Sequence, residues 1–158
     1  MTAPRTKASR QSAPDCSIER SLLVLSDRWG FLIMREALMA GVERFADFQK
    51  SLGIAPNILT DRLEHLVAAG VMTKRSYKEP GARTRRSYHL TQAGKDLAVP
   101  LAALQQWGDV HKPPRGGPSV ERRSSSGARV HVCFLDEADS PVPQEDLTFI
   151  EASRPSDR

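Results

Sequence analysis

Three features of the amino-acid sequence predict a mainly α-helical domain with one small β-hairpin. Apolar residues recur at helical spacing in four successive segments between residues 17 and 69. Two segments rich in β-forming residues follow, at 71–77 and 84–90, and the loop between them contains Pro80 and Gly81. A last stripe of apolar residues, again at helical spacing, begins after Thr91.

The first three helices are expected from their apolar faces and their end signals. Ser17 is a candidate N-cap for a helix that places Ile18 and Leu22 on one face. A second helix, at about 29–40, is apolar on nearly all sides and is therefore expected at the centre of the core. A third, short helix is expected before Gly53, which can end it.

The short connection between the third and fourth helices indicates a helix-turn-helix. Only residues 53–55 separate the third helix from Pro56, which fits the first turn of a fourth helix that runs to about residue 69. A three-residue turn containing glycine is typical of this motif. The hairpin that follows would be a wing, so the order of elements predicts a winged helix-turn-helix. In the last helix, which Thr91 caps, Pro100 is expected to cause a kink.

Composition divides the 158 residues into four parts. Residues 1–15 contain no Leu, Ile, Val or aromatic side chain, and we expect a flexible basic arm. Residues 16–112 are the predicted winged helix-turn-helix domain, and residues 113–128 are a linker rich in Pro, Gly and Ser. Residues 129–158 are a C-terminal appendage, expected as a small β-hairpin with a disordered end. Its first strand would lie at about 130–134, its turn at 136–143 and its returning strand at 147–150. Whether the appendage docks on its own domain, binds a partner or is largely disordered stays open.

Several classes of protein are excluded by composition. No apolar run approaches the roughly 20 residues that span a bilayer, and no hydrophobic segment of a signal peptide follows the basic start. Only Cys16 and Cys133 are present, so we expect a reducing cytoplasm rather than a disulfide scaffold. The net charge of +4 and the pI of about 9.4 are a mild indication of an anionic partner.

Basic residues are concentrated in the predicted wing. Six lie within 13 residues against the single acid Glu79: Lys74, Arg75, Lys78, Arg83, Arg85 and Arg86. Like charges this close repel one another unless an anion compensates them, and DNA phosphates or a narrow minor groove would do so. A merely solubilising hairpin is the alternative.

The fourth helix carries a polar face opposite its leucines. Asn57, Thr60, Asp61 and Glu64 follow the spacing i, i+3, i+4, i+7. Asn can bond the edge of adenine, Thr can contact a base edge or the thymine methyl, and Asp can accept from cytosine. Arg62, at the margin of the apolar stripe, is suited to a phosphate or to orienting the helix. A solvated helix face is the alternative to base contact.

Residues 16–112 resemble the HxlR-type winged helix-turn-helix transcriptional regulators, relatives of the MarR-type dimers. The resemblance rests on the order and spacing of several short stretches: 16–19, 28–38, 44–48, 60–66, 69–71 and 88–94. It implies a homodimer that binds a pseudo-palindromic operator. Ala55 departs from the family, in which a Ser or Thr commonly caps the recognition helix, and Asp61 and Glu64 stand where polar or basic residues are more usual.

The resemblance also implies dimerisation through the terminal helices of the domain, although the apolar stripes alone would be assigned to a core. The residues that the dimer would use are Ile18, Leu22, Leu97, Leu101, Leu104 and Trp107. DNA contacts are expected from Pro56, Asn57, Thr60, Asp61, Arg62, Lys74, Arg75, Arg83, Arg85 and Arg86. Some family members use a cysteine at the position of Cys16 to sense oxidants or electrophiles; a buried packing residue is the alternative there.

Other chemistry is not expected. The four histidines do not form a metal-binding or catalytic spacing, and there is no Gly-rich phosphate loop or Ser-His-Asp pattern. We therefore predict a cytoplasmic, non-enzymatic DNA-binding regulator without a metal or cofactor. Whether it also responds to an oxidant or a small-molecule effector stays open. A winged-helix module that binds only protein is the alternative function.

Overall fold

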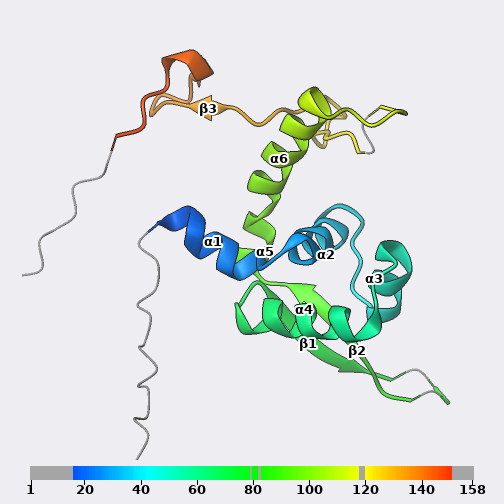
Figure 1. The fold of residues 1–158 in the computed structure, drawn as a ribbon. Helices are drawn as coiled ribbons and strands as arrows, with labels where there is room; N and C mark the ends of the chain where they lie inside the picture. The colour runs from blue at the N-terminus through cyan, green and yellow to red at the C-terminus, as the bar shows by residue number, and fades with distance from the viewer. Residues whose placement is uncertain (1–15, 79, 82, 118–119, 151–158) are drawn as a thin grey trace, which may run out of the picture. The chain divides into compact units, whose positions relative to one another are not determined.

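The computed structural model describes residues 16–78, 80–81, 83–117 and 120–150, and it confirms the mainly helical fold with a small antiparallel hairpin (Figure 1). Its helices are α1 (Ser17–Leu25), α2 (Arg28–Met39), α3 (Phe45–Leu52), α4 (Pro56–Ala68), α5 (Gln92–Asp96), α6 (Ala98–His111) and the short 3-10 helix η1 (Gln144–Asp146). Its strands are β1 (Met72–Tyr77), β2 (Arg85–Leu90), β3 (Phe134–Leu135) and β4 (Pro141–Val142). The predicted arm at 1–15 lies outside the described residues, and so do the last residues of the predicted appendage, 151–158.

The chain divides into two compact units, Met1–Leu101 and Ala102–Arg158. The division falls inside α6, whereas the sequence places the linker at 113–128. One reason is that residues 120–132 are hydrogen-bonded to the second half of α6, through Gln105 and Gln106. A segment rich in Pro, Gly and Ser has few apolar side chains to bury, but its backbone can still form hydrogen bonds with the glutamine side chains of α6.

The core of the first unit is built from the apolar faces of α2, α3 and α4. Ile33 and Met34 of α2, Phe48 of α3, and Leu59 and Leu63 of α4 are fully buried. The helix-turn-helix connection is as predicted, because Gly53 ends α3 in the left-handed conformation (φ 60°) and Pro56 begins α4. This core holds the outer face of α4 in a fixed orientation.

The junction between α1 and α2 needs both an aspartate and a glycine. Asp27 caps α2 by accepting hydrogen bonds from the backbone N–H groups of Trp29 (2.9 Å) and Gly30 (3.2 Å). A Cβ atom at Gly30 would lie 1.8 Å from the carbonyl oxygen of Leu25, so only glycine permits this close approach. The predicted cap of α1 is displaced by one residue: Cys16, rather than Ser17, is the N-cap, and it makes no side-chain cap hydrogen bond.

The hairpin pairs β1 with β2 in antiparallel register, from Met72 opposite Leu90 to Tyr77 opposite Arg85. The segment before α3 lies along the other edge of β2, where Arg44 forms a bridge to Ser87 and the N–H of Tyr88 donates to the Glu43 carbonyl (2.7 Å). β2 is therefore held on both sides.

The predicted last helix is interrupted rather than kinked. Thr91 caps α5 as expected, by accepting from the N–H of Gly94 (3.1 Å), but α5 ends at Asp96 and α6 begins at Ala98. Pro100 has no N–H to donate to Asp96, and its ring would clash with that carbonyl. The break therefore falls about one turn before the proline.

The second unit contains a shorter hairpin than the sequence predicts. Phe134–Leu135 pairs with Pro141–Val142, so the returning strand is not the predicted one at 147–150. Asp136 closes the turn early, because its carboxylate accepts from the N–H groups of Ala138 (2.9 Å) and Ser140 (3.0 Å).

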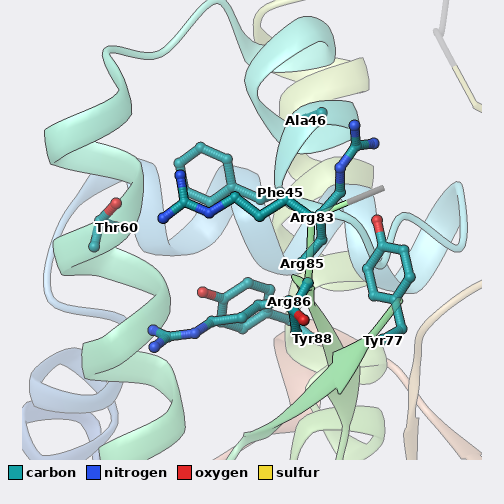
Figure 2. A pocket seen from close by; sticks show the side chains of 9 residues that line it. Phe45, Ala46, Thr60, Tyr77, Arg83, Arg85, Arg86 and Tyr88 are labelled. Atoms are coloured by element: carbon teal, nitrogen blue, oxygen red, sulfur yellow. The ribbon is translucent and has the colours of Figure 1, made fainter. Parts of the chain in front are cut away.

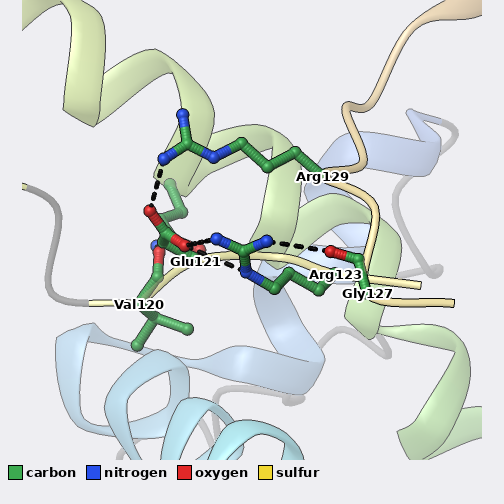
Figure 3. A network of polar contacts seen from close by, with 6 residues as sticks. Val120, Glu121, Arg123, Gly127 and Arg129 are labelled. Carbon is green, nitrogen blue, oxygen red and sulfur yellow. Dashed lines mark hydrogen bonds and ion pairs between the residues drawn. The ribbon is translucent and has the colours of Figure 1, made fainter. Parts of the chain in front are cut away.

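Upstream of that hairpin, Glu121 pairs with Arg123 (2.5 Å) and Arg129 (2.8 Å), and Arg123 also donates to the Gly127 carbonyl (2.8 Å), as Figure 3 shows. The hydrogen bond from Arg123 lowers the pKa of the Glu121 carboxyl, and the nearby charge of Arg129 adds to this effect. This network fixes the turn at 121–130.

None of the helices described is long and apolar enough to cross a membrane.

Candidate nucleic-acid interface

The polar face of α4 is open to solvent. Asn57 and Asp61 are exposed, and Thr60 is half-buried beside them. The Thr60 hydroxyl donates to the Pro56 carbonyl (2.9 Å), so its methyl group and its oxygen lone pairs, as acceptors, are what it can offer to a ligand. Ala55 provides no side-chain cap, and the first turn of α4 therefore keeps N–H groups that can face an anion.

The wing presents its basic residues on two faces, as the register of the hairpin shows. Directly opposed residues share a face, so Lys74 and Arg86 lie on the face of Tyr88, whereas Arg75 and Arg85 lie on the other. Among the described residues, Arg75, Arg83 and Arg85 have no ion-pair partner. The predicted cluster is therefore split, and only part of it faces α4.

A groove of about 630 Å³ lies between the wing and the starts of α3 and α4 (Figure 2). Arginine side chains of the wing extend across it toward α4, where Thr60 lies, and the rings of Phe45 and Tyr88 form its floor. The residues that line it are Phe45, Ala46, Thr60, Tyr77, Arg83, Thr84, Arg85, Arg86 and Tyr88. Burial raises the pKa of the Tyr88 hydroxyl, an effect that Arg86 partly opposes. The groove joins aromatic surface to concentrated positive charge.

Glu64 compensates part of the wing charge, which the sequence does not reveal. Its carboxylate lies 3.6 Å from Lys74 Nζ and 3.9 Å from an Arg86 guanidinium nitrogen. The charges along the wing segment, with Glu79 as its single acid, indicate that the basic cluster is not balanced locally. In the fold, Glu64 of α4 balances part of it. Glu64 faces the wing, which explains how an acid is accommodated on this helix.

Arg62 is partly exposed, and it is tied to the start of α2 through Asp27. Its Nε donates to Asp27 Oδ2 (2.8 Å), and a terminal guanidinium nitrogen lies 2.7 Å from the same oxygen. This hydrogen bond lowers the pKa of the Asp27 carboxyl and raises that of Arg62. Of the two roles expected for Arg62, the geometry favours orienting the helix. His65 adds a second tie, because its Nε2 lies 2.8 Å from the Leu23 carbonyl of α1.

Ser87, His89 and Glu43 come together although they are not arranged as a catalytic motif in the sequence. His89 Nδ1 lies 3.0 Å from Glu43 Oε1, and His89 Nε2 lies 2.9 Å from Ser87 Oγ. This is the order of a nucleophile, base and carboxylate, but Ser87 is buried. The neighbouring N–H of Tyr88 is already used by the Glu43 carbonyl and cannot stabilise an oxyanion. The arrangement fastens the segment before α3 to β2.

The residues predicted for a dimer fall into two groups. Leu101 is buried and Leu97 packs against the core, so these two belong to the core of the first unit, as the apolar stripe alone would suggest. Ile18, Leu22, Leu104 and Trp107 are exposed, and these remain available to a partner. Within α6, the boundary between the two units falls after Leu101 and before Leu104.

The cysteines and histidines form no metal site among the described residues. Cys16 is exposed at the start of α1 and is free, as is Cys133. The packing alternative for Cys16 is therefore not what the structure shows.

Comparison with known proteins places this arrangement in a family. The HxlR-like helix-turn-helix family matches residues 24–115. Rv3095 of Mycobacterium tuberculosis, an uncharacterised HTH-type transcriptional regulator, is 38% identical over 107 residues, which are 68% of this chain and 66% of that relative.

Two solved structures share the fold. PA1607, a candidate transcription factor, is 34% identical with a TM-score of 0.73, and the match covers 87% of this chain and 96% of that one. PA1374 from Pseudomonas aeruginosa, another candidate transcription factor, is 37% identical with a TM-score of 0.61, covering 89% and 95%. Both matches are longer than the first unit alone, so they include part of Ala102–Arg158. The chain belongs to the HxlR-like helix-turn-helix family.

Proposed function

We propose that this protein is a DNA-binding transcriptional regulator that acts as a homodimer on a pseudo-palindromic operator. The observation that carries the proposal is the open polar face of α4 beside an arginine-lined groove. The family and the names of the relatives support a DNA-binding regulator. The dimer, the operator and any response to a signal are our own inferences.

Affinity would come from the wing. Arg83 and Arg85 line the groove, and neither has an ion-pair partner among the described residues, so both can neutralise phosphates of the flanking backbone. Lys74 and Arg86 are partly neutralised by Glu64 and should contribute less.

Specificity would come from α4 in the major groove. Asn57 can make two hydrogen bonds to adenine, and Asp61 can accept from cytosine, while Pro56 and Thr60 pack against the bases. A twofold dimer would place its two α4 helices in successive grooves, roughly 34 Å apart. Replacing Asn57 with Ala should relax preference at one base position; an equal loss on every sequence would refute a base-reading role.

Electrostatic binding is tested by fluorescence anisotropy on random-sequence duplex over a series of salt concentrations. We expect the affinity to fall steeply with salt, and Arg85→Ala to reduce the magnitude of the log–log slope by about 1. Arg115→Ala removes the same charge from the second unit and should leave the slope unchanged. A wild-type protein that shows no salt-dependent binding would instead indicate a module that binds only protein.

We also propose that the protein responds to an oxidant through Cys16. The exposed thiol of Cys16 at the start of α1 is what a sensor requires. Treatment with diamide should produce a disulfide-linked species on a non-reducing gel, and Cys16→Ser should abolish it whereas Cys133→Ser should not. A pattern that is independent of Cys16 would end this part of the proposal. We expect the protein to work in the cytoplasm, without catalysis.

A further inference from the structure

The wing carries two groups of basic side chains, which differ in their partners. Lys74 and Arg86 lie near the carboxylate of Glu64, at 3.6 Å and 3.9 Å. The other group has no ion-pair partner in the part of the chain that the structure describes: Arg75, Arg83 and Arg85. One acid of α4 therefore decides how much of the wing charge is free to meet an anion.

Glu64 lies on the polar face of α4, beyond the residues expected to contact bases. It follows Asn57 at i+7 and Thr60 at i+4, and its side chain is about half exposed (52%). In helix-turn-helix complexes the first residues of the recognition helix contact base edges. We therefore expect Glu64 near the point where the helix leaves the major groove and the phosphates pass. A carboxylate in that place repels DNA.

The contact between Glu64 and the wing is held in place by the hairpin. Lys74 pairs directly with Tyr88, and Arg86 lies two residues before Tyr88 on the same face of β2. Burial raises the pKa of the Tyr88 hydroxyl, while the charge of Arg86 opposes this rise and that of Glu64 adds to it. In Figure 2 the Arg86 side chain extends from the wing toward α4. The acid and the two cations therefore meet beside one buried ring.

We propose that Glu64 is a specificity-determining residue, which withholds Lys74 and Arg86 from the phosphates of non-operator DNA. Binding to non-operator DNA depends on phosphate contacts, and the bound protein settles where most cations meet phosphates. Glu64 weakens this binding twice, because it neutralises two cations and repels the backbone. On an operator, base contacts fix the position of α4 and supply affinity that Glu64 does not reduce. This inference rests on the proposed function and adds to it a residue that suppresses competing binding.

Fluorescence anisotropy with two duplexes tests the proposal. One duplex is enriched from a random pool by the wild-type chain, and the other has the same composition in scrambled order. At low salt, Glu64→Gln should bind the scrambled duplex at least about fivefold more tightly, with a log–log salt slope larger in magnitude by about 1–2, because two cations are freed. Affinity for the enriched duplex should rise less than about twofold, so the ratio of the two affinities should fall. Glu19→Gln removes the same charge from the exposed surface of α1 and should leave the ratio unchanged.

The pairing with the wing is tested by Lys74→Gln in two backgrounds. In Glu64→Gln, this change should reduce the magnitude of the salt slope by about 1, whereas in the wild type it should reduce it by less than about half of that. A structural role of Glu64 alone would not make the effect of Lys74→Gln depend on the background. An equal reduction in both backgrounds would overturn the proposal.

The outcomes separate this inference from the proposed function. A wild type that enriches no duplex and shows no salt-dependent binding refutes the proposed function, and this inference with it. A wild type that prefers the enriched duplex, together with a Glu64→Gln variant that keeps the full ratio, overturns the inference alone. A lower ratio in Glu64→Gln but not in Glu19→Gln, with the background dependence of Lys74→Gln, is the result we expect.

Discussion

Asp27 should stabilise the fold through two separable interactions, and replacing it tests both. Its carboxylate caps α2 and also binds Arg62 of α4, at distances of 2.7–3.2 Å. Loss of an N-cap costs about 1 kcal/mol. A pair of hydrogen bonds between charged groups contributes more in a protected site, but both side chains are about one third exposed (33% and 32%), so we assign about 1 kcal/mol to it.

We therefore expect Asp27→Ala to lower the free energy of unfolding by about 2 kcal/mol. Asp27→Ser keeps an oxygen that can cap α2 and should lose only the share due to Arg62, about 1 kcal/mol. Urea unfolding followed by circular dichroism measures these differences. The double variant Asp27→Ala with Arg62→Ala should be about 1 kcal/mol more stable than the sum of the two single changes predicts, because both single changes remove the same pair.

The pH dependence follows from the lowered pKa of Asp27, whose largest cause is the hydrogen bond from Arg62. A carboxyl with a lowered folded pKa stabilises the protein above its unfolded pKa of about 4 and loses this contribution as the pH falls through the folded pKa. The difference between the wild type and Asp27→Ser should be greatest near neutral pH and shrink below about pH 4. Additive single variants, or a difference that does not depend on pH, would refute the role given to the Arg62 pair.

Three further predictions concern packing and charge. Gly94→Ala should destabilise the protein by roughly 2 kcal/mol or more, because its Cβ would lie 2.0 Å from a backbone carbonyl, whereas Gly108→Ala has open space and should be neutral or stabilising in thermal melts. Glu64→Gln should change stability by less than about 1 kcal/mol and increase DNA affinity in anisotropy titrations, since it frees two wing cations; a weaker affinity would contradict this. Leu101→Ala should cost about 2–5 kcal/mol in urea unfolding if it is a core residue, and a negligible loss would return it to the dimer interface.

The order of the elements could be predicted from the sequence because it depends on local signals. Gly53 and Pro56 mark the turn of the helix-turn-helix, because glycine readily adopts the left-handed conformation and proline fits the first turn of a helix. Thr91 marks the start of α5, because its hydroxyl caps the helix. The limits of α4 and of both wing strands agree with the predicted ones to within one residue. The signal for the cap at Asp27 was also present, since an aspartate stands directly before the second helix.

The pairings within the site could not be predicted, because they join residues that are distant in the sequence. Arg62 is 35 residues from Asp27, and the carboxylate that meets His89 belongs to Glu43. An acid on the polar face of a recognition helix does not show whether it reads a base or meets the wing, and only the hairpin register places Lys74 near Glu64. The opposite burial of Leu101 and Leu104 likewise depends on where the first unit ends.

The contacts of α4 with DNA are tested most directly by selecting bound duplexes from a random pool with the purified full chain. We expect enrichment of an inverted repeat with half-sites centred one helical turn apart, about 10 base pairs, and a change at one symmetric pair of positions in Asn57→Ala. A pool that shows no enrichment, or a consensus that Asn57→Ala leaves unaltered while the wing variants change it, would contradict the assignment of α4 as the reading helix.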